Sequence, residues 1–274
     1  MSTRDSFRLR YRLVNGSILG SFSYLELSTA DEKEYSLTMT PLNRLAVGII
    51  GIPHLGFRMR ARIILSEARK ANKTEKILDA GCGYGLYAMS LGELGYDVDA
   101  IDIDSRRIKV LTKMFAEYPI LKDAINLHTG SLTSLPFPSN SYERIICSEV
   151  IEHMEKDNKA ISELSRVLKP GGRLILSVPH DSKFNRKTFK RFGHERSGYT
   201  KEMLQTIMKG HNLIIEKVFY YERTIGTMLF NVFNSLHSKS LMGIFFYPFY
   251  LLYLLDYYIG FGEPNQIVVT AWKI

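Results

Sequence analysis

The sequence has few cysteines and no uncharged stretch long enough to span a bilayer, and each scarcity excludes a class of protein. Two cysteines among 274 residues, Cys82 and Cys147, cannot form a disulfide framework, so we do not expect a small secreted scaffold. Residues 240–255 carry no charge, but Pro248 interrupts them and they are shorter than the roughly 20 residues that span a bilayer as a helix. The first residues carry charge where a secretory signal has an apolar run, so we expect a cytoplasmic protein.

Composition and charge narrow the alternatives further. The chain is 45% apolar and 12% aromatic, which excludes a disordered protein. The net charge of +8 divides into +6 over residues 1–76, −3 over 77–179, +5 over 180–224 and zero over 225–274. A basic excess is compatible with nucleic acid, an anionic membrane, an anionic substrate or solubility alone.

The N-terminal region is predicted to be a separate extension. Apolar residues alternate with arginines from Phe7 to Leu13, and Asn15-Gly16 leads into a second run, which predicts a β-hairpin with an arginine face. From Pro41 to Ala71 the periodicity is helical. We expect residues 1–74 to form this hairpin and helical extension.

The remaining residues, 75–274, are predicted to form one α/β domain. Apolar runs predict strands at 76–80, 97–103, 125–129, 143–148, 173–179, 213–221 and 266–273. Helical periodicity lies between them at 84–95, 105–117, 155–168 and 200–210. Alternating strands and helices indicate a mostly parallel sheet with helices on both faces. The uncharged segment lies before the last strand, so residues 224–264 are an insertion.

A glycine-rich loop, Asp79-Ala-Gly81-Cys-Gly83-Tyr-Gly85, joins the first strand to a helix. Glycines permit a tight turn and bring backbone N–H groups close to a ligand at a helix N-terminus. The third glycine lies too early for the G-x-G-x-x-G pattern, which argues against a dinucleotide.

Asp102 ends the second predicted strand, 17 residues after Gly85. A carboxylate at that strand end can accept both hydroxyls of a ribose, so an adenosine ligand fits. The alternative is that Asp97, Asp99, Asp102 and Asp104 only cap and solvate the loop.

Motifs in chain order resemble the class I S-adenosylmethionine (SAM)-dependent methyltransferases. They are residues 77–91 (ILDAGCGYGLYAMSL), 100–104 (AIDID), 130–142 (GSLTSLPFPSNSY), 145–153 (IICSEVIEH) and 163–179 (ELSRVLKPGGRLILSVP). The resemblance, closest to the group that includes ubiquinone-biosynthesis enzymes, implies a Rossmann-like, seven-stranded sheet in the order 3-2-1-4-5-7-6 with the last strand antiparallel. It also implies SAM as cofactor.

The resemblance further implies which residues hold the cofactor. Asp79, Gly81, Cys82, Gly83 and Gly85 would contact its methionine part. Asp102 would bind the ribose, and Ile103 would cover one face of the adenine. The family often has an acidic residue where this chain has Ser131, which leaves adenine recognition to Ser131, Leu132 or backbone.

Glu149, Glu152 and His153 follow the fourth predicted strand, and a short helix there would place all three on one face. Two carboxylates and an imidazole can supply a general base, for which we favour His153 oriented by Glu149, or hold a divalent cation such as Mg²⁺. The E-x-x-E-H pattern resembles metal-assisted O-methyltransferases, and His194 is the matching fourth ligand. Methyltransferases with Glu-His here and no metal are the alternative, as is a purely structural role.

The insertion has three interpretations: peripheral contact with the inner face of a membrane, a lid over the substrate site, or a dimer interface. The basic segments 58–70 and 183–196 are expected to face anionic lipid in the first. We therefore expect O-methylation of a lipophilic acceptor such as a quinone, isoprenoid or lipid-linked glycan. The alternative is a soluble metabolite under a lid, and an RNA-binding methyltransferase ranks below both. The oligomeric state is left open.

Overall fold

The computed structural model describes residues 55–116, 119–237 and 242–274. The predicted N-terminal hairpin and most of the helical region after it lie outside the described residues. The described chain divides into two compact units. Residues 63–221 and 263–274 form the larger unit, and residues 55–62 and 222–262 form the smaller one.

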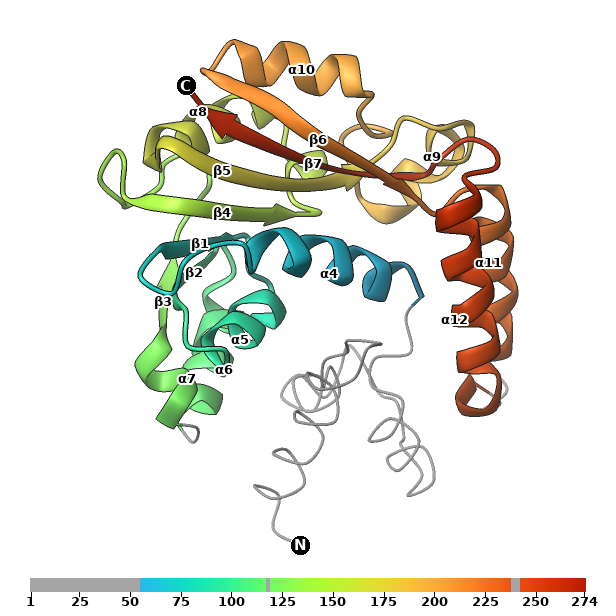
Figure 1. The fold of residues 1–274 in the computed structure, drawn as a ribbon, viewed down its shortest axis with the longest axis horizontal. Helices are drawn as coiled ribbons and strands as arrows, with labels where there is room; N and C mark the ends of the chain where they lie inside the picture. The colour runs from blue at the N-terminus through green and yellow to red at the C-terminus, as the bar shows by residue number, and fades with distance from the viewer. Residues whose placement is uncertain (1–54, 117–118, 238–241) are drawn as a thin grey trace, which may run out of the picture. The chain divides into compact units, whose positions relative to one another are not determined.

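The larger unit is built on one seven-stranded sheet (Figure 1). Its strands are β1 (Lys76–Ala80), β2 (Asp97–Asp102), β3 (Ile125–Thr129), β4 (Tyr142–Ser148), β5 (Leu168–Pro179), β6 (Leu213–Tyr221) and β7 (Gln266–Lys273). The strand order is β3-β2-β1-β4-β5-β7-β6. Strands β1 to β5 are parallel, and β7 is antiparallel to both β5 and β6. The structure thus confirms the expected class I methyltransferase fold.

Strand β5 begins five residues earlier than the sequence predicts. The preceding helix, predicted over residues 155–168, ends at Val167. The chain then extends directly into the sheet, and Leu168 pairs with Tyr142 across an irregularity in the β4–β5 register. Gly171 adopts a φ of 76°, a conformation that glycine reaches easily.

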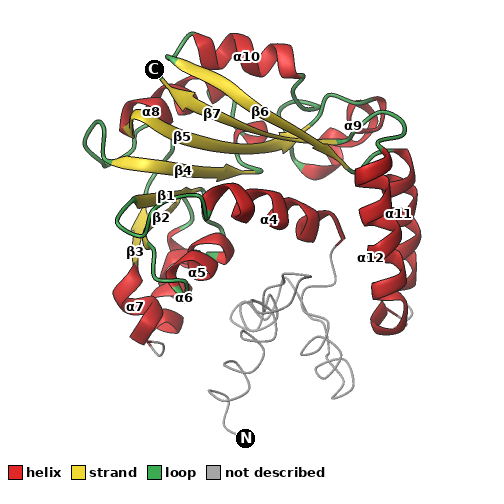
Figure 2. Cartoon of the chain, viewed as in Figure 1, coloured by secondary structure: helices red, strands yellow, loops and turns green. Residues whose placement is uncertain are grey.

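Helices surround the strands, as Figure 2 shows. They are α4 (Leu55–Ala68), α5 (Leu86–Gly92), α6 (Ser105–Ala116), α7 (Pro119–Ala124), α8 (Asp157–Val167), α9 (Lys183–Thr188) and α10 (Lys201–Lys209), with 3-10 turns η1 (Ile151–His153) and η2 (Phe189–Phe192). Thr200 caps α10 by accepting a hydrogen bond from the N–H of Met203.

Alternate residues of β1 point to opposite faces of the sheet. Ala80 belongs to a buried apolar cluster on one face, which includes Leu164 of α8 and Leu204 of α10. Asp79 faces the other side, where its carboxylate accepts a hydrogen bond from the N–H of Ala88 in α5. Helices therefore cover both faces, as a parallel sheet requires.

The smaller unit contains two helices from the insertion, α11 (Thr224–His237) and α12 (Met242–Ile259), which pack against each other. Pro248 lies inside α12. Within the described ranges, no helix combines the length and the apolar character that crossing a membrane requires.

Candidate cofactor and acceptor site

The loop between β1 and α5 is shaped by three glycines with positive φ: 78° at Gly81, 54° at Gly83 and 68° at Gly85. A Cβ at Gly81 would also lie 2.5 Å from Cγ2 of Val150, so this position excludes a side chain on two grounds. An added Cβ at Gly83 would meet no heavy atom within 4 Å. The loop is thus packed at its start and open in its middle, where a ligand can approach the backbone.

Asp102 connects the end of β2 to this loop. Its Oδ2 accepts a hydrogen bond of 2.8 Å from the N–H of Gly83, and its Oδ1 accepts one of 2.9 Å from the N–H of Asp104. The side chain of Ile103 beside it is 74% exposed. The carboxyl ends of two adjacent parallel strands therefore bring the glycine loop, an anchored carboxylate and a free apolar side chain together.

Two titratable groups below the loop are strongly affected by burial. Asp79 is 2% exposed, and burial raises its pKa to about 7, with a smaller contribution from the negative charge of Asp102. Burial also raises the pKa of the Cys82 thiol. Cys82 therefore stays a neutral packing residue, whereas Asp79 can respond to a cationic ligand near neutral pH.

The segment after β3 adjoins the same strand end. Gly130 donates its N–H to the carbonyl of Asp102 at 3.0 Å. The Ser131 Oγ lies 2.9 Å from Oγ1 of Thr133. The Leu132 side chain belongs to the buried cluster, which leaves its backbone for the predicted adenine contact.

The segment after β4 differs from the predicted short helix. Glu149 has a φ of 56°, and its N–H donates to the carbonyl of Ser177 in β5, so the chain leaves the sheet in a left-handed conformation. The 3-10 turn begins only at Ile151. Glu149 therefore does not share a helical face with Glu152 and His153, and its Oε1 accepts a hydrogen bond from the Ser177 hydroxyl at 3.0 Å. Strained non-glycine backbone of this kind is often found at functional sites.

Three of the four predicted metal ligands do come together. One ligand atom each of Glu152, His153 and His194 lies within 4.8 Å of the others. The two imidazole rings are perpendicular, with centroids 4.6 Å apart, and His153 Nδ1 lies 3.0 Å from the carbonyl oxygen of Gly193. Burial, followed by the charge of His153, lowers the pKa of His194. Glu195 donates its N–H to the carbonyl of Glu152, which fixes the two segments together.

Some residues at this edge carried no signal in the sequence. The Tyr87 hydroxyl of α5 lies 3.3 Å from the Ser148 hydroxyl at the end of β4. His180 follows β5, and burial lowers its pKa. Neither stands in a pattern of chemically related residues, so only the three-dimensional arrangement places them here.

Two further histidines, His128 and His211, contact polar side chains of the larger unit. His128 Nε2 lies 3.4 Å from the buried carboxylate of Asp99, and His211 Nε2 lies 2.7 Å from Oδ1 of Asn158.

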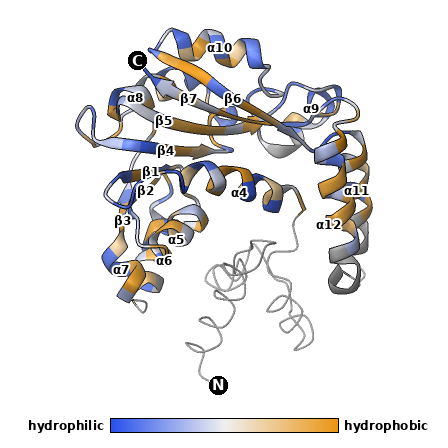
Figure 3. Cartoon of the chain, viewed as in Figure 1, coloured by the Kyte–Doolittle hydropathy of each residue, from blue (hydrophilic) through white to orange (hydrophobic). Residues whose placement is uncertain are grey.

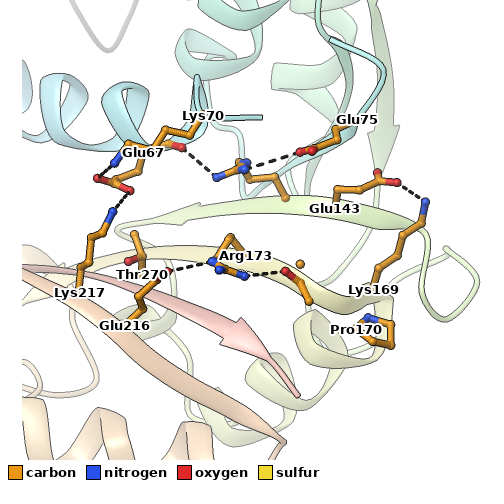
Figure 4. A pocket seen from close by; sticks show the side chains of 13 residues that line it. Glu67, Lys70, Glu75, Glu143, Lys169, Pro170, Arg173, Glu216, Lys217 and Thr270 are labelled. Atoms are coloured by element: carbon orange, nitrogen blue, oxygen red, sulfur yellow. Dashed lines mark hydrogen bonds and ion pairs between the residues drawn. The ribbon is translucent and has the colours of Figure 1, made fainter. Parts of the chain in front are cut away.

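A cavity of about 480 Å³ lies at the opposite edge of the sheet, beside the start of β4 (Figure 4). Ion pairs line it: Glu67 contacts both Lys70 and Lys217, and Glu216 accepts from Arg173 at 2.9 Å. Ligands of open α/β sheets bind outside the carboxyl ends of the strands, which is where the glycine loop lies. We therefore assign a structural role to the ion pairs that line this cavity.

Comparison with known proteins agrees with this geometry. A family described as "Methyltransferase domain" matches residues 78–176. Ubiquinone biosynthesis O-methyltransferase of Schizosaccharomyces pombe is 35% identical over 104 residues, which are 38% of each chain. Demethylmenaquinone methyltransferase of Renibacterium salmoninarum is 28% identical over 153 residues, covering 56% of this chain and 58% of that protein.

Among solved structures, geranyl diphosphate methyltransferase in complex with SAM superposes with a TM-score of 0.60 at 16% identity. The alignment covers 79% of this chain and 85% of that one, and at this identity it shows the fold alone. The chain spans less than two thirds of the length of the two curated relatives above.

Proposed function

We propose, from the premise that residues 78–176 form a class I SAM-dependent methyltransferase domain, that the chain transfers a methyl group from SAM to an oxygen of a quinone-type acceptor. The observation that carries the cofactor assignment is the open glycine loop, with Gly83 tied to Asp102 beside the exposed Ile103. The acceptor class is supported by the names of two relatives, a ubiquinone biosynthesis O-methyltransferase and a demethylmenaquinone methyltransferase. Because such acceptors reside in bilayers, we expect the enzyme to meet its substrate at a membrane surface.

The chemistry requires alignment and a proton acceptor. The acceptor oxygen attacks the methyl carbon in line with the carbon–sulfur bond, which breaks and leaves the sulfur as a neutral thioether. The hydroxyl proton passes to a base, and we assign this role to His153. If its Nδ1–H donates to the carbonyl of Gly193, Nε2 is unprotonated and available. The expected orienting role of Glu149 toward His153 stays a prediction, because the Glu149 carboxylate accepts a hydrogen bond from the Ser177 hydroxyl and His153 Nδ1 lies against the Gly193 carbonyl.

The His153 assignment is tested with labelled SAM and a demethyl quinol that has a short side chain. His153→Asn should lower kcat roughly 100-fold, the usual contribution of a general base. Its SAM dissociation constant should not change. His211→Asn is the matched control, because His211 contacts Asn158 and has no assigned role. Wild-type turnover by His153→Asn would remove His153 from the mechanism.

A metal-assisted reaction is the second candidate, because Glu152, His153 and His194 offer converging ligand atoms. One carboxylate oxygen and two imidazole nitrogens suit Zn²⁺, Fe²⁺ or Ni²⁺ better than Mg²⁺, which prefers oxygen ligands. A bound cation would lower the pKa of the acceptor hydroxyl, and His153 would then be a ligand. Chelator treatment followed by readdition of one of these divalent cations separates the candidates: turnover that survives a strong chelator excludes the metal.

Two further alternatives have their own readouts. If the acceptor is a soluble metabolite and residues 224–264 form a lid, deleting the insertion should raise KM for a water-soluble acceptor. If the substrate is RNA, binding should weaken steeply with salt, because phosphate contacts release counterions. The quinone proposal expects neither result.

A further inference from the structure

The α11–α12 hairpin of the smaller unit has polar groups in its seam. Asp256 is 1% exposed, and its Oδ2 accepts a hydrogen bond of 2.9 Å from the N–H of Arg223, directly before α11. The Tyr253 hydroxyl donates to Oε2 of Glu222 at 2.8 Å. A Cβ at Gly226 would lie 2.5 Å from Asp256 Oδ2, so the two helices approach closely here.

The outer face of α12 is apolar. From residue 248 to the end of the helix, every exposed position is a proline, a leucine, an isoleucine or a tyrosine. Five of them are between 48% and 68% exposed: Leu251, Leu252, Leu255, Tyr258 and Ile259. Their spacing of 0, 1, 4, 7 and 8 places them on one side of a helix.

Further apolar side chains are exposed on α11 and beyond α12, although Thr224 and Asn231 of α11 are exposed as well. Ile225, Met228 and Val232 are 40%, 64% and 41% exposed and lie at helical spacing. Phe261, just after α12, is 66% exposed. Figure 3 shows the hydrophobic colour along both helices. This arrangement reverses that of a helix in water, which directs its apolar side inward.

The charged side chains at the surface of the smaller unit are basic among its described residues. Among its described residues, the acidic side chains Glu222 and Asp256 are buried, whereas Arg62 is exposed and Arg60 partly so. The sequence-based expectation was wrong for Arg58, which is 1% exposed with its guanidinium over the Tyr250 ring. The accessible charge is therefore positive and complementary to anionic headgroups.

We propose that the α11–α12 hairpin inserts its outer apolar side chains into the interfacial layer of an anionic bilayer. A protein partner would need hydrogen bonds at roughly one per 100–200 Å² of interface, and from residue 248 to the end of α12, where side chains are described, the exposed positions offer only the Tyr258 hydroxyl as a side-chain partner. A bilayer interior needs none. No described helix can span, so the hairpin lies in the plane of the interface. The inference rests on the proposed function, because the enzyme would reach a quinone-type acceptor at the bilayer interface.

The test is flotation of the full-length chain with vesicles of phosphatidylcholine, with and without phosphatidylglycerol. Wild-type protein should float, and more strongly with the anionic lipid. Leu251→Glu/Leu255→Glu should lower the vesicle partition coefficient by at least about tenfold. The matched control is Ile120→Glu in α7, an apolar side chain of the larger unit that is 54% exposed. SAM binding by calorimetry should be equal in all three proteins.

Each result decides. Wild-type protein that stays in the soluble fraction, or a double variant that floats like wild type, overturns the proposal. A wild type that does not float but is a dimer, and that the double variant makes monomeric, assigns the face to a second copy. Methylation of a short-chain, water-soluble quinol is measured in parallel. If none of the three proteins methylates this quinol, the proposed function is contradicted and the flotation result still stands.

Discussion

The carboxylate of Asp102 accepts a hydrogen bond of 2.8 Å from the backbone N–H of Gly83. This contact joins the end of β2 to the open part of the glycine loop, and it orients the carboxylate whose oxygens would receive the ribose hydroxyls. If Asp102 binds the ribose as we propose, this bond couples the shape of the loop to the binding of adenosine.

Replacing Asp102 should weaken SAM binding more than it weakens folding. Asp102→Ala removes charge-assisted hydrogen bonds to the ribose, so we expect the dissociation constant to rise roughly 10- to 100-fold in calorimetry. The control is Asp97→Ala at the other end of β2, which is exposed. Equal effects of the two substitutions would show that Asp102 only stabilises the loop.

Stability should fall as the pH rises through the titration of Asp79. Its pKa in the folded protein is about 7 against an ordinary value of 3.8, so the folded state binds the proton more tightly. In the SAM-free protein, the contribution of Asp79 to the free energy of unfolding should be greatest at and below about pH 4. It should then decrease between about pH 4 and pH 7. Denaturant titrations of wild type and Asp79→Asn measure the difference, which should disappear in the variant.

The same carboxyl group should release a proton when SAM binds near pH 6. The cationic sulfonium and ammonium of SAM favour the ionised form of Asp79 and so lower its pKa. Calorimetry in two buffers of different ionisation enthalpy should give different heats for wild type and equal heats for Asp79→Asn. Equal heats for wild type would mean that Asp79 is already ionised or does not sense the ligand.

Gly81→Ala should destabilise the domain by about 3 kcal/mol, because a positive φ and a collision with Val150 act together. Gly95→Ala separates the two causes: Gly95 has a φ of 79° and nothing within 4 Å of an added Cβ. Gly95→Ala should lower the free energy of unfolding by only about 1 kcal/mol, because it forces a side chain into the left-handed conformation without a collision. Denaturant unfolding provides both values, and Gly81→Ala/Val150→Ala should recover most of the difference. A similar cost for both single variants would contradict the collision.

Asp256→Ala should loosen the α11–α12 hairpin. It removes the acceptor for the Arg223 N–H at the start of α11, at a cost of about 1–3 kcal/mol for a buried donor. Faster hydrogen exchange over residues 222–237 should report this, with exchange in β1 and β4 unchanged. Asp256→Asn keeps an acceptor oxygen and should exchange nearly as wild type does. Unchanged exchange in Asp256→Ala would show that the seam does not depend on this bond.

Periodicity was sufficient to predict the strands, the helices and a mostly parallel sheet, whereas the strand order, the antiparallel last strand and the cofactor were predicted from the family resemblance. Apolar runs alternating with helices determine the layers, and the positions of Gly81 and Asp102 at consecutive strand ends bring them together in any parallel sheet. The early start of β5 was not predictable, because its pairing depends on an irregularity opposite Tyr142.

The geometry of the acidic and histidine residues needed the structure. A helical spacing was assumed from Glu149 to His153, but the left-handed backbone of Glu149 removes it from that face. His194 lies beside His153 only because the chain after β5 returns to the Glu152 backbone. The sequence left membrane contact, a lid and a dimer interface open for the insertion, and only the structure shows which leucines of α12 are exposed, since leucines at helical spacing ordinarily indicate a buried face.

The most direct test of the central claim is methyl transfer from isotopically labelled SAM to a short-chain demethyl quinol, followed by mass spectrometry of the product. We predict one labelled methyl group on an oxygen of the quinol with the wild-type chain, and roughly 10- to 100-fold less product with Asp102→Ala at the same sub-saturating SAM concentration. SAM binding by the wild type without any labelled quinol product would contradict the assignment of a quinone-type acceptor.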